Sequence, residues 1–555
     1  MHAYVLISFA FSLAASQPIT VTVNSTALGV TETRFLSWNI DPSCNRGFHW
    51  INFSNPNLIA AAASLSPSRL RFGGSGADDL VYSFGNDGAC ASVPPPSPAN
   101  CHYVTAGCLN ATHFSSLLGL LASNDPGAQF SNQFIFGLSF NISQAQRGHP
   151  WDPANAQRLL AFLRWPSETV WGFELGNEIN NPGGVKPRQQ ADAITALSHL
   201  LGPSGRIIGP DSGGANPEAW DAALLPLVAG ALHAVTHHVY LSLTPKMFAS
   251  TDTLADKLDS PLPEIAWYTA LVRQSSSQNI RPSRTNTALP PHNPYTLTNR
   301  CAVKHPAPRF GRARTAPLGA ATMAPAGRPP FAESGAPRCG TRTTRGCAQS
   351  TALCSTTGRT FLAARALSLL LDRCSVPPSP PNIHTRHPHY HRYGLVNSET
   401  MAMSLGAEDP VVIKPDFWVS FLWKRLLGTS VLNASTSSRD VRAYAYSDAP
   451  PSVFAEPACA SAPLQLLLLN LRNASADVAL PPGSSTYSLW ALAPVDGTAL
   501  STAATLNGAA LPGRLDVREG DPAFLRRIST PPAVGSVGTP LTLAPLAVAF
   551  LCYHT

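Results

Sequence analysis

The first half of the chain alternates between short apolar runs and longer segments whose apolar residues have helical spacing. The apolar runs typical of buried strands are residues 34–41, 69–75, 134–140, 170–178, 206–211 and 234–241. The segments with helical spacing are residues 58–65, 114–122, 154–163, 189–201 and 219–232. Strands that alternate with helices form parallel sheets, so the pattern predicts an α/β architecture.

The pattern changes towards the C-terminus. After a helix predicted over residues 416–427, short strands separated by turn residues dominate the chain. These strands are predicted at residues 441–446, 464–471, 487–492 and 541–550. Such spacing is typical of an antiparallel β-sandwich. We therefore assign residues 17–425 to the α/β domain and residues 426–555 to a β-sandwich domain.

The composition fits a folded protein with little surface charge. Of the 555 residues, 44% are hydrophobic and 13% are charged, whereas roughly a quarter of the residues in soluble domains are charged. The longest apolar run, residues 4–15, is shorter than the roughly 18 residues that span a bilayer. We therefore predict no transmembrane helix.

The N-terminal apolar run is followed by small residues, including Ala14 and Ser16, which favours a signal peptide over residues 1–16. A buried first strand is the alternative, because no Lys or Arg precedes the run. Six Asn-x-Ser/Thr sequons agree with passage through a glycosylating compartment. They begin at Asn24, Asn52, Asn110, Asn141, Asn433 and Asn473. We expect a secreted glycoprotein in an extracellular or lysosome-like compartment.

The formal net charge of +7 comes from one segment. Residues 279–392 contain 16 Lys and Arg, 15 of them Arg, against the two acids Glu333 and Asp372. The rest of the chain has 23 basic and 30 acidic residues, a net charge of −7. The segment also holds 16 of the 52 prolines and five of the 11 cysteines. Its composition therefore differs from that of the surrounding chain.

Three explanations compete for residues 279–392: a disordered basic insertion, a nucleic-acid-binding tail moved inward, or translation of a GC-rich gene in a wrong reading frame. The scarcity of Lys and the scattered cysteines favour the third, because basic arms usually contain Lys. A nucleic-acid or heparin binder that uses this segment is a rival interpretation.

One strand end carries side chains suited to acid–base chemistry. Asn177 and Glu178 end the apolar run of residues 170–178, and functional residues of (β/α)-barrels sit at the C-terminal ends of strands. A carboxyl group there can protonate a leaving oxygen while the amide binds a substrate hydroxyl. The simpler interpretation is a polar strand end formed by Glu174 and Glu178.

The run from Phe173 to Glu178 resembles the acid/base motif of glycoside hydrolase family 79, the heparanase and β-glucuronidase group. Further stretches resemble the same family in the same order along the chain. They are Phe35-Leu36-Ser37 with Asp41, Leu70 to Ser75, Gly209 to Asp211, Val235 to Tyr240, Tyr393 to Leu395, Pro415 to Trp418 and Leu506 to Gly508. The resemblance covers nearly everything except residues 279–392. It implies a (β/α)8 TIM barrel with a C-terminal antiparallel β-sandwich domain.

The resemblance also implies roles for individual residues. Glu178 would be the acid/base of a retaining glycosidase that cleaves β-linked uronic acid glycosides, and Asn177 would bind the sugar 2-hydroxyl. The remaining residues implied to line the glycone pocket are Asp41, Ser75, His238, Tyr240, Tyr393 and Gly394. We expect Arg71 to be an ion-pair partner beneath the site and His237 to be a core histidine.

A retaining glycosidase needs a second carboxylate about 5 to 5.5 Å from the first to act as the nucleophile. The family places it after strand seven in a Trp-x-Gly-Glu context, which the sequence as written lacks. The glutamates between Glu178 and Glu399 are Glu218, Glu264 and Glu333, and none of them follows a predicted strand. The nucleophile is therefore not identifiable in the sequence as written.

A shifted reading frame makes the missing motif available. When the last base of each codon is read with the first two of the next, Phe310 to Arg314 permits Trp-x-Gly-Glu if Arg314 is encoded by AGA or AGG. Leu318 to Ala321 then permits three glycines, like the glycine run that follows the family's nucleophile. We therefore expect residues 279–392 as written to lack a packed strand seven, to be poorly ordered and to leave the protein inactive.

The expected ligands follow from these features. No Cys/His spacing or Gly-rich phosphate loop stands on a suitable element, so we expect no metal and no cofactor. The expected partner is a uronic-acid-containing glycan or glycoside, with peripheral association at membranes or cell-surface glycans and no nucleic acid. A carbohydrate-binding pseudoenzyme is the alternative function. Cys459 and Cys552 should form a disulfide, because both fall in the sandwich half and secreted chains rarely leave cysteines free.

Overall fold

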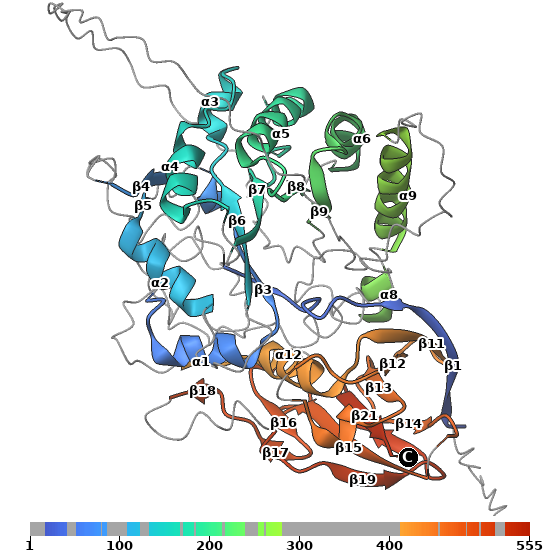
Figure 1. The fold of residues 1–555 in the computed structure, drawn as a ribbon. Helices are drawn as coiled ribbons and strands as arrows, with labels where there is room; N and C mark the ends of the chain where they lie inside the picture. Colours follow the sequence, from blue (N-terminus) through green and yellow to red (C-terminus); the bar gives the residue numbers. More distant parts are fainter. Residues whose placement is uncertain are drawn as a thin grey trace, which may run out of the picture. The chain divides into compact units, whose positions relative to one another are not determined.

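The computed structural model contains a parallel sheet with helices and a largely antiparallel sheet (Figure 1). It describes residues 17–40, 52–78, 80–85, 108–121, 132–166, 170–181, 185–213, 217–238, 254–259, 262–279, 411–452, 455–483, 485–498, 501–516 and 528–554. All of them lie in one compact unit, formed by Met1–Arg281 and Ala348–Thr555.

The parallel sheet has the strand order β2-β3-β6-β7-β8-β9. Its strands are β2 (Trp38–Ile40), β3 (Arg69–Phe72), β6 (Gln133–Leu138), β7 (Val170–Leu175), β8 (Ile207–Ser212) and β9 (Leu232–His237). Every residue of β3 and of β8 is buried, as expected for barrel strands that are covered on both faces. The predicted strands therefore form neighbouring strands of a (β/α)-barrel in chain order.

Helices connect these strands and cover the sheet (Figure 1). They are α1 (Pro56–Ser64), α2 (Ala111–Leu121), α3 (Ile142–Gln146), α4 (Ala154–Leu163), α5 (Pro187–Leu201), α6 (Pro217–Val228), α8 (Leu254–Asp259) and α9 (Leu262–Asn279), with the short 3-10 helix η2 (Ser75–Ala77). The strands β4 (Val81–Ser83) and β5 (Cys108–Asn110) form a separate parallel pair. Asn55 caps α1, because its side chain accepts from the amides of Asn57 and Leu58.

The second large sheet has the order β17-β16-β15-β21-β13-β12-β11-β1-β14-β20, and β19 pairs with β15. Its strands are β1 (Ile19–Val30), β11 (Ser430–Thr436), β12 (Val441–Ser447), β13 (Gln465–Asn470), β14 (Ala476–Ala479), β15 (Thr486–Pro494), β16 (Ala504–Leu506), β17 (Ala509–Ala510), β19 (Ala533–Ser536), β20 (Leu541–Leu543) and β21 (Val548–Tyr553). A small pair joins β10 (Val411–Val412) to β18 (Arg514–Leu515). The predicted sandwich region is thus built mainly from antiparallel pairs.

The strand β1 does not belong to the barrel sheet, although the domain range predicted for the barrel starts at residue 17. It pairs antiparallel with β11 and parallel with β14. Along β1, more and less exposed residues alternate in the first half, and most residues of the strand are exposed. In contrast, every residue of β3 is buried. A half-exposed strand suits the face of an antiparallel sheet, so the first described strand belongs to the sandwich and the strands from β2 to β9 that follow include those of the barrel.

One strand predicted over residues 541–550 is two strands in the structure. β20 ends at Leu543 and β21 begins at Val548. Between them, Pro545 has no amide hydrogen for a ladder, and Leu546 has a φ of 55° in the left-handed region. The backbone there cannot continue a strand, so the long apolar run is divided by a turn.

The helix α12 (Pro415–Leu426) is buried along its entire length and packs against the antiparallel sheet. Its apolar residues share one core with the sheet residues Val548 and Phe550 and with Ala61 of α1. Two of its buried residues, Lys424 and Arg425, are basic. The Nζ of Lys424 donates to the backbone oxygen of Pro67, and Arg425 donates to Ser64 O at 2.8 Å. These bonds connect α12 to the last residue of α1 and to the segment that follows it.

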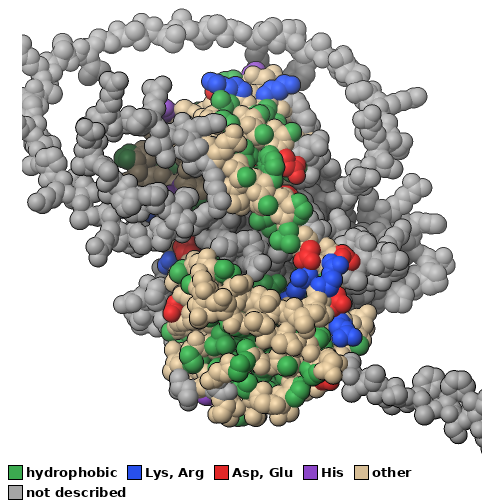
Figure 2. Space-filling view, turned by 90° about the vertical axis from the view of Figure 1, so that its right-hand side faces the viewer, with side chains coloured by type: hydrophobic (Ala, Val, Ile, Leu, Met, Phe, Trp, Pro, Cys, Tyr) green, Lys and Arg blue, Asp and Glu red, His purple; other side chains and the backbone are tan. Residues whose placement is uncertain are grey.

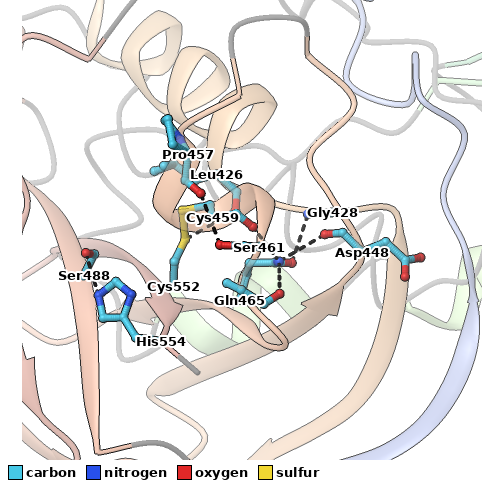
Figure 3. Close-up of a disulfide and its surroundings, with 11 residues drawn as sticks. Leu426, Gly428, Asp448, Pro457, Cys459, Ser461, Gln465, Ser488, Cys552 and His554 are labelled. Atoms are coloured by element: carbon cyan, nitrogen blue, oxygen red, sulfur yellow. Dashed lines mark hydrogen bonds between the residues drawn. A yellow bond between two sulfur atoms is a disulfide. The ribbon is translucent and has the colours of Figure 1, made fainter.

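A disulfide joins Cys459 and Cys552, as predicted (Figure 3). Their Cα atoms are 5.1 Å apart and both residues are fully buried. Cys459 lies in α13 (Pro457–Ala460) and Cys552 in β21. Beside the bond, the buried Gln465 side chain donates to the backbone oxygen of Asp448 and accepts from the amide of Gly428. The disulfide and this glutamine together fasten the loops at this end of the sheet.

Figure 2 shows charged side chains of both signs gathered at one place on this face, with further charged side chains scattered over a surface that is mostly hydrophobic or uncharged. On α8, Asp256 and Asp259 form ion pairs with Arg439 and Arg442, at 2.5 Å and 2.7 Å. No helix of the described segments is long and apolar enough to cross a membrane. The predicted signal peptide and residues 280–392 lie outside the described residues.

Candidate active site

The candidate site is built from the C-terminal ends of neighbouring parallel strands. Arg71 lies in β3, Glu174 near the end of β7, and Asp211 near the end of β8. Glu178 follows β7 and His238 directly follows β9. Because parallel strands present their C-terminal ends at one edge, residues distant in the sequence meet there.

Arg71 organises the base of this cluster. Its Nε donates to Glu174 Oε2 at 2.6 Å, and its Nη2 forms an ion pair with Asp211. The same guanidinium donates to Asn39 Oδ1 at 3.2 Å and to Asn177 Oδ1 at 3.1 Å. With a side chain only 4% exposed, Arg71 lies beneath the site as an ion-pair partner.

The two carboxylates on Arg71 experience different environments. Burial raises the pKa of Glu174 to about 7, although Arg71 opposes this effect. Burial acts in the same direction on Asp211, but the charges of Arg71 and His238 outweigh it and hold the pKa of Asp211 below its usual value. Asp211 is therefore the ionised member of the pair at neutral pH.

Glu178 is held at both carboxylate oxygens. His238 Nδ1 lies 2.6 Å from Oε1, and the Asn181 side-chain amide donates to Oε2 at 2.8 Å. The Glu178 side chain is 13% exposed, so it is reachable from outside. Its φ of 49° is left-handed, a conformation that is uncommon for glutamate and gathers at functional sites. A Cβ at Gly213 would lie 2.5 Å from Glu178 Oε1, so a larger residue there would displace the Glu178 side chain.

His238 bridges two carboxylates. Its Nε2 lies 2.8 Å from Asp211 Oδ1, while its Nδ1 faces Glu178. Burial lowers the pKa of His238, but the charge of Asp211 and the hydrogen bonds to Asp211 and Glu178 prevail and raise it to about 9. The ring is therefore an imidazolium at neutral pH, and both nitrogens donate.

The structure brings several predicted site residues together. Asn177 Nδ2 donates to the exposed Ser75 Oγ at 3.4 Å, and its backbone amide donates to Asp78 Oδ1 at 2.9 Å. His238 has no exposed side-chain surface, so it reaches the site only through Glu178. The predicted residues that lie outside the described segments are Asp41, Tyr240, Tyr393 and Gly394.

His237, expected to be a core histidine, is half-buried and stacks on Tyr268 with ring centroids 3.7 Å apart. The Tyr268 hydroxyl donates to Asp221 Oδ2 at 2.7 Å, and Ser212 Oγ donates to the same oxygen at 2.5 Å. Burial raises the pKa of Asp221 to about 7. This group lies next to the site but does not contact Glu178 through any of these bonds.

Sequence reasoning missed the role of two residues. Asp211 was part of a family-like stretch but was not assigned to the site, and Asn181 was not considered. Asp211 is a carboxylate at a barrel strand end, which is the same signal that selected Glu178. Asn181 lies three residues beyond Glu178 in a turn, and no pattern in the sequence indicates that its amide folds back onto that carboxylate.

The chemistry of this cluster is that of acids and bases. Its members are carboxylates, an imidazolium, a guanidinium and amides. Among the described residues, no group of three or more His, Cys, Asp or Glu side chains is arranged to hold a metal ion. A carboxyl that is reachable from outside and fixed by neighbours can transfer a proton to a bound oxygen.

The fold matches that of a barrel glycosidase. The structure resembles that of a 4-O-α-L-rhamnosyl-β-D-glucuronidase from Fusarium oxysporum, with a TM-score of 0.50 and 12% sequence identity. The match covers 96% of this chain and 100% of the glucuronidase chain. This likeness concerns the fold, a TIM barrel with an accessory β-sandwich.

Sequence comparisons relate part of the chain to a known family. Residues 40–262 match the model described as the N-terminal domain of glycosyl hydrolase family 79. Heparanase of Gallus gallus is 27% identical over 184 residues, and heparanase-like protein 3 of Arabidopsis thaliana is 24% identical over 201 residues. These matches cover 28% and 34% of this chain and 34% and 37% of the relatives, about a third of their length. The segment that carries Asn177 and Glu178 therefore lies within the part of the chain that is similar to the N-terminal domain of glycosyl hydrolase family 79.

Proposed function

We propose that the protein is a retaining glycoside hydrolase that cleaves β-linked uronic acid glycosides, with Glu178 as the acid/base. The observation that carries this proposal is the placement of Glu178. Its partly exposed carboxyl follows a barrel strand in a family 79 domain, beside Asn177 and between His238 and Asn181. The names of the relatives, a heparanase and a heparanase-like protein, favour a uronic-acid-containing glycan as the substrate.

In the proposed reaction, Glu178 protonates the glycosidic oxygen as the bond to the leaving group breaks, and later removes a proton from the incoming water. Asn177 binds the sugar 2-hydroxyl, and the exposed Ser75 hydroxyl beside it contacts the same sugar. Arg71 fixes Asn177 by donating to its Oδ1. This bond directs the Asn177 amide nitrogen outward, where a hydroxyl oxygen can accept from it.

The nucleophile belongs to the part of the chain outside the described residues. We propose that residues 279–392 are written in a wrong reading frame and that the nucleophile is the glutamate of the concealed Trp-x-Gly-Glu. Asp41, Tyr240, Tyr393 and Gly394 stay predictions for the glycone pocket.

We also propose that the protein is secreted, glycosylated and associated peripherally with membranes or cell-surface glycans. Three of the six sequon asparagines, Asn24, Asn141 and Asn473, are exposed, as attachment of a glycan requires.

The test is hydrolysis of β-glucuronides by the protein translated from its own transcript. Heparan-type oligosaccharides and an aryl β-glucuronide are incubated with the protein, and the anomer released first is determined by NMR. The proposal predicts cleavage with retention of the β configuration. Binding of the oligosaccharides without cleavage would instead identify a carbohydrate-binding pseudoenzyme, and release of the α anomer would exclude the retaining mechanism.

A further inference from the structure

We propose that Asp211, acting through His238, is the positioning residue for Glu178. The inference rests on the proposed function, because it assigns a task to groups behind the proposed acid/base. Asp211 holds the imidazolium of His238, and the imidazolium in turn holds one oxygen of Glu178.

The geometry places the three residues in a line. Asp211 Oδ1 lies 2.8 Å from His238 Nε2, and His238 Nδ1 lies 2.6 Å from Glu178 Oε1. The backbone reinforces this line, because the Glu178 amide donates to Asp211 O at 2.9 Å and the His238 amide donates to Ser212 O at 2.7 Å. The Asp211 and His238 side chains are buried, at 1% and 0% exposed, whereas the Glu178 side chain is 13% exposed. Only the last member is within reach of a substrate.

The positive charge of the His238 ring allows it to donate a hydrogen bond to both carboxylates. A neutral imidazole has one N–H, so it could donate to only one of the two carboxylates and would turn a lone pair towards the other. An imidazolium donates to both. The pKa of His238, about 9, keeps that form dominant at neutral pH.

The surrounding charges determine which residue maintains the imidazolium. Arg71 opposes the positive charge of His238, whereas Asp211 and Glu178 favour it. The carboxyls of Glu174 and Asp221 lie nearby, and burial raises the pKa of each to about 7. Among these groups, Asp211 is the buried carboxylate whose pKa is lowered, so it supplies the fixed negative charge.

The second oxygen of Glu178 is held differently. It accepts from Asn181, which is exposed. A buried ionic contact on one oxygen and an exposed amide contact on the other make the inner oxygen the anchor. A bound substrate can replace the amide at Oε2 without disturbing the bond between Oε1 and His238. The leaving group would therefore receive its proton from Oε2.

The first test uses the full chain and needs no activity. The histidine ring signals are followed by NMR during a pH titration, and the His238 signal is identified by its loss in His238→Gln. In Asp211→Asn the titration midpoint of His238 should fall by about 1 to 3 pH units. The matched control is Asp221→Asn, which removes a neighbouring buried carboxyl that bonds Ser212 and Tyr268. It should leave the midpoint of His238 unchanged. An unchanged midpoint in Asp211→Asn would overturn the inference.

The second test separates positioning from general support of the fold. In the protein translated from its own transcript, Asp211→Asn should lower kcat on natural uronides by about 100-fold, with little change in KM. The rate of the first step on an aryl glucuronide with an activated leaving group should change little, because such a group departs without protonation. Equal losses on both substrates would overturn the inference. His238→Gln should show the same substrate pattern, which provides a second variant if Asp211→Asn folds poorly.

The two tests distinguish this inference from the proposed function. If the wild-type protein cleaves uronides and the His238 midpoint does not respond to Asp211, the inference fails and the function stands. If the midpoint responds but no glycoside is cleaved, the charged pair exists and the assignment of Glu178 as an acid/base fails, together with the role that rests on it.

Discussion

Glu178 Oε1 and His238 Nδ1 lie 2.6 Å apart, although 60 residues separate them in the sequence. The contact depends on the register of β7, β8 and β9, which places the ends of all three strands at one edge of the parallel sheet. The result is a partly exposed carboxyl with a buried charged support.

The ion pairs of Arg71 should be essential for stability. Arg71→Met would remove the cation that the buried carboxyls of Glu174 and Asp211 share and leave only His238 to pair with Asp211, so we expect a loss of about 3 to 5 kcal/mol in the free energy of unfolding. Urea denaturation measures it. The control is Arg188→Met, because Arg188 forms an exposed pair with Asp192, and its removal should cost about 0.5 kcal/mol or less. Similar losses in the two variants would contradict this role of Arg71.

Lys424 should make stability depend on pH. Burial, reinforced by Arg34 and Arg69 and opposed by Glu32, lowers the pKa of Lys424 from 10.5 to about 7. Between these values the unfolded chain binds a proton that the folded chain does not, so the Lys424 contribution to stability should rise as the pH increases from about 7 to 10.5. Below this window the unfavourable contribution is constant.

Lys424→Met keeps the side-chain length and removes the titrating group. In this variant the rise in stability across the window should be reduced, as measured by denaturation at several pH values. A wild-type curve that is parallel to that of the variant across the window would show that Lys424 is not the group responsible.

The disulfide should stabilise the β-sandwich. Cys459 and Cys552 are separated by 93 residues, and closing a loop of this length contributes roughly 4 kcal/mol in the chain-entropy model. Replacing both cysteines with Ala should lower the free energy of unfolding by about this amount, measured in urea without reductant. The wild-type protein with its disulfides reduced should shift in the same direction. A double variant as stable as the oxidised protein would rule out this contribution.

Sequence patterns predicted the barrel elements well because their environments are uniform. The helix predicted at 154–163 is α4 with the same bounds, and Arg69 to Phe72 forms the predicted strand before a glycine turn. Strands and helices of a barrel repeat one local pattern, so periodicity is sufficient to find them.

Features that depend on tertiary contacts could not be predicted as well from the sequence. The basic residues Lys424 and Arg425 suggest an exposed helix face, but carbonyl groups at the end of α1 and just after it accept from both inside the protein. The membership of β1 in the second sheet depends on β11, which lies about 400 residues further on. In the site, Glu178 and Asp211 both have the sequence signal of a carboxylate at a strand end, whereas the contacts of His238 with these two carboxylates become visible only when β7, β8 and β9 are aligned.

The reading frame of residues 279–392 can be tested by sequencing the transcript. We expect the transcript to encode this region in another frame, with Trp-x-Gly-Glu at residues 310–314, and the chain as written to be inactive. A transcript in the present frame would contradict the proposal. Glycosidase activity of the chain as written, lost on substitution of Glu333, would contradict it equally.

The most direct test of the central claim is the chemistry of Glu178→Ala in the protein translated from its transcript. An acid/base variant should lose activity on natural uronides by a factor of about 100 or more, while circular dichroism remains that of the wild type. On an aryl glucuronide with an activated leaving group, added azide should restore turnover and yield the β-glucuronosyl azide, because azide attacks the glycosyl-enzyme without needing a general base. Unchanged turnover of natural uronides by Glu178→Ala would contradict the assignment of Glu178 as the acid/base.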